Sequence, residues 1–576
     1  MELTRTPDVE VAEPRFLPSD FDAANLGQIR SLMTHLEERP IGSVDELRRW
    51  IYDGSELSSY IHGEYVRRMT AMNRDTASDE LRQRLLDYQR DVLAPVRIAG
   101  NRLDRRYLEC PYREELGSEF TVLDREKQTS ADLFREENVA LSTREGELGA
   151  RYQQIVGAQS VEIDGEKLTL QQCAARLQER DRSVREQAWR AMTERTEQDA
   201  DAIDEVYDEL LEIRQQMAVN AGFENYRDYA FVAKMRFDYT PADCEGYFEA
   251  VREMVLPLGR RLTEQRRELL GYESVRPWDV EVSVFGTEPT RIFEDQEGYI
   301  RETRRLFKAV DPVFDEEFDI LVRNGMLDLM SRPGKAPGGY NVMVEDIRLP
   351  FIFYNAVGLR SDLRTLLHEG GHAFHSLAAR NIPMVDYRHS PTEFAEVASM
   401  SMELFGLERM EQVWGLDEAR EVAYPHLVGT ARGLLSIALI DAFQHWIYTH
   451  PGHTREQRAE QWLALSDSLR QGVDHTGVER YRRHAWQRVP HFFTHPLYYI
   501  EYGIATIGAF QLWLNESRDH DAAVAAYRRA LALGGSRPLP ELFEAAGIRF
   551  AMDKEILGEV MPAVERRIKE LAPERS

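Results

Sequence analysis

Two histidines and a glutamate stand at helical spacing in the stretch His368-Glu369-Gly-Gly-His372. On an α-helix, residues four apart lie one turn above each other, so His368 and His372 project from one face and can bind the same metal ion. Two neutral imidazoles and one carboxylate suit zinc and leave a fourth position for water, whose pKa the metal lowers to about 7. Glu369 lies beside His368, where it can accept the proton of that water. The stretch therefore predicts one zinc ion per chain and a catalytic base.

Two glycines inside this expected helix, Gly370 and Gly371, are unusual because each costs about 1 kcal/mol relative to alanine. A helix accepts that cost where another backbone must pass close by, and a third zinc ligand requires such a neighbour. Ser361 is the expected N-cap of the helix. His375 lies three residues after His372, an offset that points its side chain away from the pair. We therefore expect either a histidine packed in the core or one that contacts a metal ligand without binding the metal itself.

The carboxylate that such a site requires has three candidates in the next segment, Glu393, Glu396 and Glu403. Glu396 and Glu403 are seven residues apart and share a helical face, and Glu393 lies one turn before Glu396. The other residues of this helix are mostly apolar, and a buried glutamate needs a partner, which zinc would supply. One glutamate can ligate and another can orient a ligating histidine. Spacing alone does not choose between them.

A cluster of aromatic residues near the C-terminus could supply hydrogen-bond donors to an oxyanion that develops when a zinc-activated water attacks a carbonyl group. Tyr498 and Tyr502 are four residues apart, so both hydroxyls could point from one helical face into a cleft. The alternative is an aromatic cluster that packs a helical core.

An extended segment follows the turn at Gly338 and Gly339 and runs to Phe353. It could present an open strand edge to which the backbone of a peptide adds, with the glycines permitting close approach and Tyr340 in contact with the substrate. The alternative is a structural hairpin that covers the zinc helix.

Long amphipathic helices with apolar residues at three- and four-residue spacing make up most of the chain. Around Asp164-Gly165, alternating apolar residues predict a short β-hairpin. A chain of 576 residues exceeds the size of one hydrophobic core, so two or three packed subregions are expected. We predict an N-terminal helical region over 1–200 and a catalytic domain over 201–576, although no break in composition marks the boundary.

The formal net charge of −27 repels phosphate backbones and anionic membranes and argues against a nucleic-acid or lipid partner. The three cysteines, Cys110, Cys173 and Cys244, form no CxxC pair, so neither a thiolate zinc site nor a disulfide framework is expected. The N-terminus lacks the pattern of a signal peptide. The most apolar segment, Leu434 to Phe443, is too short to span a bilayer. These features predict a cytoplasmic protein.

At two of these segments the sequence resembles the oligoendopeptidase F and thimet oligopeptidase family of zinc metallopeptidases. The resemblance rests on His-Glu-Gly-Gly-His-Ala-Phe-His over 368–375 and Phe-Ala-Glu-Val-Ala-Ser over 394–399. Shorter stretches agree with it at 222–229, 276–279, 338–340 and 534–536. The similarity covers most of the chain and is weakest in roughly the first 100 residues.

This resemblance implies roles that spacing leaves open. Glu396 is expected to be the third zinc ligand, with Glu403 supporting the histidines from behind. A histidine and the two tyrosines, Tyr498 and Tyr502, are expected to stabilise the transition state or bind substrate. His491 and His495 both precede the tyrosines at a spacing that departs from the family, and we favour His491.

The implied fold is mostly α, with many helices around a deep substrate channel, the N-terminal region as one wall, and a small β-hairpin or sheet beside the zinc helix. The implied activity is hydrolysis of internal bonds in short oligopeptides, by a monomer or a simple homo-oligomer. A zinc carboxypeptidase on a similar helical fold is the nearest alternative, and it would need a basic group for the free C-terminus of its substrate. A catalytically inactive peptide-binding protein is the other, and the intact residues at 368, 369, 372 and 396 argue against it.

Overall fold

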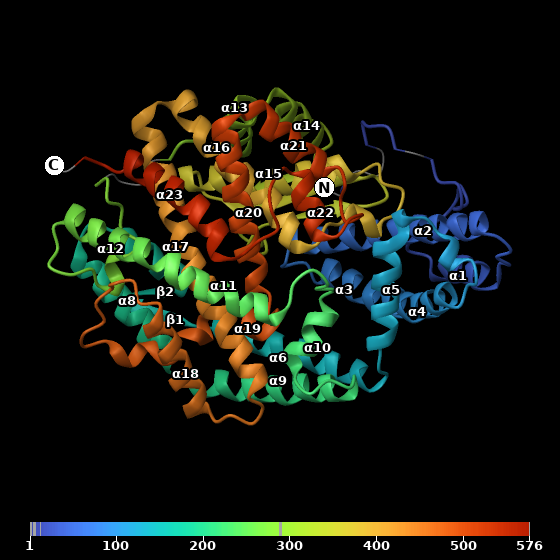
Figure 1. Cartoon of the computed structure of the whole chain (residues 1–576), viewed down its shortest axis with the longest axis horizontal. Helices are drawn as coiled ribbons and strands as arrows, with labels where there is room; N and C mark the ends of the chain where they lie inside the picture. Colours follow the sequence, from blue (N-terminus) through green and yellow to red (C-terminus); the bar gives the residue numbers. More distant parts are fainter. Residues whose placement is uncertain (1–2, 4–6, 12, 287–290, 575–576) are drawn as a thin grey trace. The chain divides into compact units, whose positions relative to one another are not determined.

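The computed structural model describes residues 3, 7–11, 13–286 and 291–574, and its fold is mostly α-helical with few strands, as predicted (Figure 1). Its contacts divide the chain into two compact units. The first unit contains Met1–Asp132, Pro289–Val422 and Gly508–Phe550, and the second contains Leu133–Glu288, Ala423–Ile507 and Ala551–Ser576. Each unit is thus assembled from three separate stretches of chain.

The first unit carries the predicted metal-binding motif. Its helices are α1 (Leu26–Glu38), α2 (Val44–Arg74), α3 (Asp79–Tyr88), α4 (Ala94–Leu108), α5 (Thr121–Leu133), α13 (Gln296–Val310), α14 (Pro312–Arg323), α15 (Arg360–Ala379), α16 (Thr392–Trp414), α21 (His520–Leu531) and α22 (Leu539–Ala545).

The second unit is built from helices and one hairpin. Its helices are α6 (Glu137–Gly157), α7 (Leu170–Ala175), α8 (Arg182–Glu197), α9 (Ala200–Asn220), α10 (Tyr226–Ala233), α11 (Pro241–Met254), α12 (Leu256–Leu270), α18 (Arg455–Ser468), α19 (His491–Thr494) and α23 (Lys554–Leu571). Two further helices, α17 (Leu416–Thr449) and α20 (Tyr499–Arg518), begin in one unit and end in the other.

Residue 200, where the sequence placed a boundary, lies inside the second unit at the start of α9. The compact units therefore do not follow that boundary, because helices distant in the sequence pack into the same core. The division into an N-terminal wall over 1–200 and a catalytic domain over 201–576 stays a prediction.

A three-stranded sheet lies against α15 in the order β3-β5-β4. Strand β4 (Tyr340–Val344) pairs antiparallel with β5 (Leu349–Ala356), as the extended segment predicted, and β3 (Leu327–Met330) pairs parallel with β5 on its other side. The first five residues of β5 are buried, which explains why it reads as a continuous apolar run. Strand β3 was not predicted, because four residues are too few to show a period.

The predicted hairpin at Asp164-Gly165 is confirmed. Strands β1 (Ser160–Ile163) and β2 (Glu166–Thr169) pair antiparallel across this turn. Asp164 and Gly165 both have positive φ, 57° and 81°, as a two-residue type I′ turn requires.

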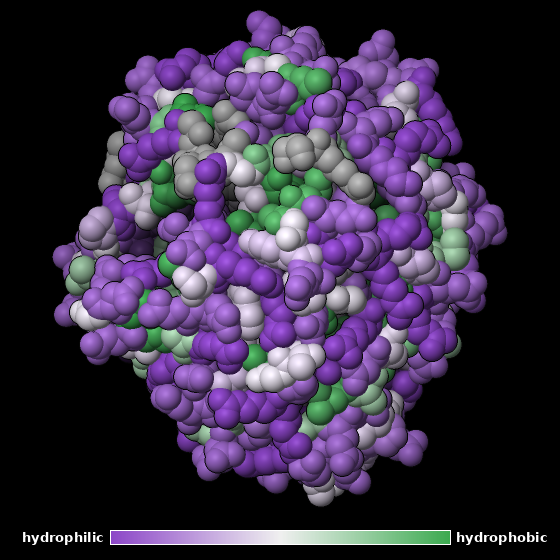
Figure 2. Space-filling model, turned by 90° about the vertical axis from the view of Figure 1, so that its left-hand side faces the viewer, coloured by the Kyte–Doolittle hydropathy of each residue, from purple (hydrophilic) through white to green (hydrophobic). Residues whose placement is uncertain are grey.

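Helix α17 extends well beyond the apolar segment Leu434 to Phe443 in both directions. Among the described residues it is the one helix long and apolar enough to cross a membrane by these two criteria alone, with a mean hydropathy of 1.3 over its best 18-residue window. That window is 56% buried, and the core helix of a globular protein meets the same criteria. On the face drawn in Figure 2, hydrophilic residues predominate and separate the hydrophobic areas from one another.

Candidate metal centre

The helix that carries the two histidines begins at an anchored turn. Helix α15 starts at Arg360 with Leu359 as its N-cap, two residues before the expected cap at Ser361, so that prediction was wrong. The buried carboxylate of Asp362 instead accepts hydrogen bonds from the backbone N–H groups of Val357, Gly358 and Leu359, each at 2.9 Å. A carboxylate in the first helical turn also interacts favourably with the helix dipole. Asp362 therefore fixes the direction in which α15 leaves the sheet.

Helix α16 packs directly on α15 at the second glycine of the motif. A Cβ atom at Gly371 would lie 2.6 Å from the Cα atom of Ser399 and 2.7 Å from the carbonyl oxygen of Ala398, far inside ordinary contact. A Cβ at Gly370 would instead meet the ring of Phe307 on α13. The close backbone approach that the two glycines predicted is present, and it brings the glutamates of α16 to the histidines of α15.

Three donor atoms converge where the two helices meet. His368, His372 and Glu396 each offer one ligand atom, and these atoms lie within 4.8 Å of one another. Oε2 of Glu396 is 3.5 Å from Nε2 of His368 and 3.8 Å from Nε2 of His372. Two imidazole nitrogens and one carboxylate oxygen at this separation are a donor set that suits zinc with one open position.

Glu403 holds the first histidine from behind. Its Oε1 atom lies 2.6 Å from Nδ1 of His368, and its Oε2 atom lies 3.8 Å from the guanidinium of Arg364. A hydrogen bond donated by Nδ1 leaves the Nε2 lone pair directed at the other donors. Burial lowers the pKa of His368, but the hydrogen bond and charge of Glu403 outweigh it and raise that pKa to about 9. The Nε2 side of this ring thus favours a cation.

The other two polar residues of the motif, His372 and Glu369, have pKa values shifted by burial. Burial lowers the pKa of His372 to about 4, so its imidazole is neutral and can act as a ligand. Burial raises the pKa of Glu369 to about 7, which the neighbouring His368 partly offsets. Oε2 of Glu369 is buried without a hydrogen-bond partner, as expected for a base that waits for a proton donor.

The remaining polar residues of the two segments lie outside this donor set. Glu393 is buried on α16, but it does not belong to the group of converging ligand atoms. His375 is buried, its Nε2 atom lies 3.2 Å from the hydroxyl of Ser390, and its ring contacts Phe394 edge-on. It is therefore a core histidine, one of the two readings of its offset.

A family model agrees with this centre. The model of peptidase family M3 matches residues 175–561, which is more than half of the chain and includes both helices of the donor set. The chain belongs to peptidase family M3. The expected membership of the oligoendopeptidase F group of this family is also supported by its relatives.

Among the relatives of this M3 chain, the plasmid oligoendopeptidase F of Lactococcus lactis subsp. cremoris is 22% identical over 404 residues. That match covers 69% of this chain but 65% of the relative, so the match spans slightly less than two thirds of that protein. Oligopeptidase PepF of Bacillus subtilis is 24% identical over 308 residues, a match that covers 51% of this chain and 44% of the PepF chain.

Two solved structures show the same helical M3 fold. PZ peptidase A with an inhibitor superposes with a TM-score of 0.88 at 24% identity, over 97% of this chain and 100% of its own. Oligoendopeptidase F from Enterococcus faecium superposes with a TM-score of 0.63 at 16% identity, over 95% of this chain and 97% of its own. At these identities the likeness shows the fold alone.

The predicted oxyanion residues of this M3 chain form a cluster within the second unit. The ring of His491 lies 5.6 Å from Tyr498 and 6.1 Å from Tyr502, and the two tyrosine rings are 5.1 Å apart. The ring of His495 lies 6.1 Å from that of Tyr498. Tyr498 lies immediately before α20, which begins at Tyr499 and contains Tyr502. The preceding residue, Leu497, has a φ of 57°, so the helix does not extend back beyond Tyr498.

Within this aromatic cluster, His491 has an unpartnered ring nitrogen and a lowered pKa. Nδ1 of His491 is buried without a hydrogen-bond partner, and burial with the charges of His495 and Lys234 lowers its pKa to about 4. His491 is therefore neutral at pH 7. Its part in catalysis, like that of both tyrosines, stays a prediction.

The predicted substrate-binding residues lie at the start of β4. Gly338 has a φ of +92°, and a Cβ at Gly339 would meet the ring of Tyr354. Tyr340 stacks on Phe353 of β5 with ring centroids 4.9 Å apart, and its hydroxyl accepts a hydrogen bond from Asn73 of α2 at 3.0 Å. The sequence did not reveal this contact with α2. Because the sheet order places β4 at an edge, its outer side is where a further strand would add.

Proposed function

We propose that this chain is a zinc-dependent endopeptidase that hydrolyses internal peptide bonds of short oligopeptides. The observation that carries the proposal is the convergence of His368, His372 and Glu396, together with the buried Glu369, whose Oε2 atom has no hydrogen-bond partner. Membership of family M3 and the names of the relatives, oligoendopeptidase and oligopeptidase, support the same activity.

The residues of the donor set would hold one zinc ion through Nε2 of each histidine and the carboxylate of Glu396. A bound zinc ion supplies a water molecule whose pKa is lowered to about 7. Glu369 would take the proton of that water, because its Oε2 atom is buried and lacks a hydrogen-bond donor. The same carboxyl would then pass the proton to the leaving amine.

Glu403 keeps His368 in the tautomer that presents Nε2, so it is a positioning residue. We further propose that Tyr498, Tyr502 and His491 donate to or bind the substrate carbonyl, in the manner of an oxyanion site. Substrate would extend along the edge of β4 beginning at Gly338, Gly339 and Tyr340, through main-chain hydrogen bonds that tolerate different side chains.

Replacing Glu369 with glutamine tests the role of the base. The amide keeps the size of the side chain but cannot accept the proton, so kcat should fall by about 10²–10⁴-fold while zinc content stays unchanged. The matched control is Glu411→Gln at an exposed position of α16, which should keep full activity. Undiminished hydrolysis by a zinc-loaded Glu369→Gln protein would overturn the mechanism.

A peptide series with free and amidated C-termini separates the proposed activity from the carboxypeptidase alternative. An endopeptidase should cut both forms at the same internal bond, whereas a carboxypeptidase should stop at the amide.

We also propose a cytoplasmic location, with oligopeptides as partners and neither nucleic acid nor membrane, and a monomer or simple homo-oligomer. Mass spectrometry of a digested peptide library and sedimentation of the purified protein address the substrate and the assembly.

A further inference from the structure

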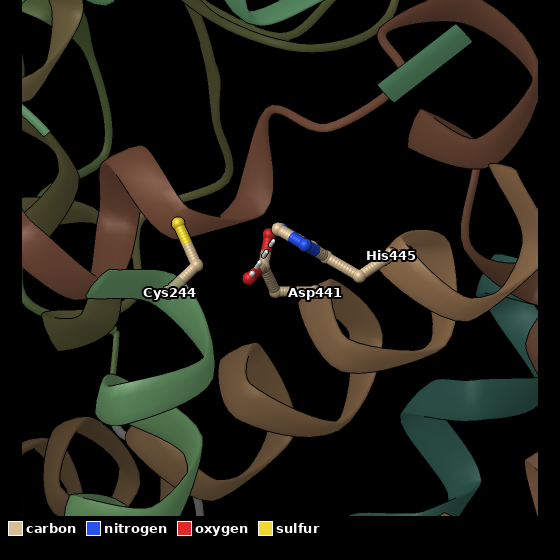
Figure 3. Close-up of side chains that lie close together, drawn as sticks. All are labelled: Cys244, Asp441 and His445. Atoms are coloured by element: carbon tan, nitrogen blue, oxygen red, sulfur yellow. Dashed lines mark ion pairs between the residues drawn. The ribbon is translucent and has the colours of Figure 1, made fainter. Parts of the chain in front are cut away.

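A second group of metal-ligating side chains is buried in the second unit, formed by Cys244 of α11 and by Asp441 and His445 of α17 (Figure 3). One ligand atom from each lies within 4.8 Å of the other two. Nε2 of His445 is 3.4 Å from Oδ2 of Asp441, and these two residues are four apart on one face of the helix. Figure 3 shows the carboxylate of Asp441 between the sulfur and the imidazole.

Three polar atoms of this group are buried without hydrogen-bond partners. Exposed fractions are 2% for Cys244, 2% for Asp441 and 6% for His445. Both ring nitrogens of His445 and Oδ1 of Asp441 have no hydrogen-bond partner. Burying an unsatisfied polar group costs about 1–3 kcal/mol, so three such atoms at one point require an explanation. A bound cation would give a partner to atoms of Asp441 and His445 that form no hydrogen bond within the protein.

The charges around the group leave room for a divalent ion. The charge of Arg236 acts on Asp441, and its guanidinium is bound to Oε1 of Glu501 at 2.7 Å and to the carbonyl of Leu497. Glu501 thus offsets part of the charge of Arg236, and the same carboxylate oxygen also lies 3.3 Å from Nζ of Lys234. The thiolate of Cys244 and the carboxylate of Asp441 would then balance the two charges of the metal.

We propose that Cys244, Asp441 and His445 form a second metal site, specific for a borderline transition-metal ion such as Zn²⁺. A sulfur, a nitrogen and an oxygen ligand favour zinc over magnesium or calcium, which prefer oxygen alone. Binding releases the proton of the thiol, and a water molecule completes the coordination. The ion joins α11 to α17, which the hydrogen bond from the Tyr247 hydroxyl to the carbonyl of Leu434 also connects, at 3.3 Å. Its role is structural, because the residues are inaccessible to a substrate.

The expectation that the chain has no thiolate zinc site followed from the absence of a CxxC pair. The proposed site needs no such pair, because its sulfur and its other ligands come from helices far apart in the chain. This proposal does not rest on the proposed peptidase activity. The centre of His368, His372 and Glu396 contains no sulfur, so a metal bound to the thiolate of Cys244 can be detected separately from it.

Cobalt spectroscopy of the metal-free, full-length protein distinguishes the two centres. Co²⁺ bound to a thiolate gives an intense charge-transfer band in the near ultraviolet, which a site with only nitrogen and oxygen ligands lacks. Titration with Co²⁺ should produce this band in the natural protein, and Zn²⁺ should remove it by displacement. Total zinc after reloading should approach about two ions per chain, one for each site.

Cys244→Ser should abolish the band and lower bound zinc by one ion per chain. Cys173→Ser is the matched control, because Cys173 is also fully buried and reduced but lies outside the group. His445→Gln provides a second variant should the serine protein fail to fold. If the folded natural protein shows no thiolate band with Co²⁺, or if the band survives in Cys244→Ser, the site does not bind metal and the three residues are a neutral buried cluster.

Discussion

Gly371 lies where α15 touches the backbone of α16, so an added methyl group there has nowhere to go. In Gly371→Ala the Cβ would start 2.6 Å from Cα of Ser399, whereas ordinary contact begins at 3.4 Å, so the two helices must separate by about 0.8 Å. Both neighbouring atoms belong to backbone and cannot rotate aside. Overpacking of this kind costs about 1–3 kcal/mol.

An alanine in a helix also gains about 1 kcal/mol over glycine, and this gain must be subtracted. Gly54 in the middle of α2 is the matched control, because a Cβ there meets nothing within 4 Å. Gly54→Ala should raise the free energy of unfolding by up to about 1 kcal/mol. Gly371→Ala should therefore be less stable than Gly54→Ala by about 1–3 kcal/mol in urea or guanidinium titrations.

The same displacement moves Glu396 away from the histidines. Metal sites tolerate errors of about 0.2 Å in ligand position, so a shift of about 0.8 Å should weaken zinc binding at least about 10-fold in a chelator competition. Gly54→Ala should bind zinc normally. If Gly371→Ala matches Gly54→Ala in both stability and zinc affinity, the close approach of the helices does not build the metal centre.

Two further substitutions test the centre and the surrounding fold. Glu403→Ala removes the hydrogen bond to His368 and should lower zinc affinity about 10–100-fold in a chelator competition. The control, Glu411→Ala at an exposed position, should leave zinc affinity unchanged. Equal zinc affinities of the two variants would refute the positioning role of Glu403. Burial and the charge of Asp386 raise the pKa of Glu126 from 4.5 to about 7. Since this folded-state pKa lies above the unfolded one, the carboxyl costs stability increasingly as the pH rises from 4.5 through 7. After allowance for its partial exposure, Glu126→Gln should be more stable than the natural protein by about 1–2 kcal/mol at pH 8 and nearly equal at pH 4. Equal stability at both pH values in urea titrations would show that Glu126 has an ordinary pKa.

Features that depend on neighbours along the chain could be predicted from the sequence. The four-residue spacing of His368 and His372 places both on one helical face whatever the fold, because the α-helix has a fixed pitch. The turn at Asp164-Gly165 likewise follows from the backbone angles that its two residues permit. The paired glycines even indicated that a second backbone lies against the helix.

Features that depend on how helices cross needed the tertiary structure. Spacing left Glu393, Glu396 and Glu403 open, and only the packing of α16 on α15 places Glu396 at Nε2 and Glu403 at Nδ1 of His368. The positive φ of Leu497, which lies between α19 and the segment of Tyr498 and α20, has no local signal, since leucine with a positive φ is imposed by its surroundings.

The buried group of Cys244, Asp441 and His445 is the clearest case of this kind. A lone cysteine and an Asp-x-x-x-His spacing occur by chance in many helices, and nothing in either segment indicates the other. Contacts between distant segments depend on the sum of many weak packing interactions over the whole core, which no local pattern in the sequence records. The sequence therefore determined the chemistry that each helix offers, and the packing of the helices decided which side chains meet.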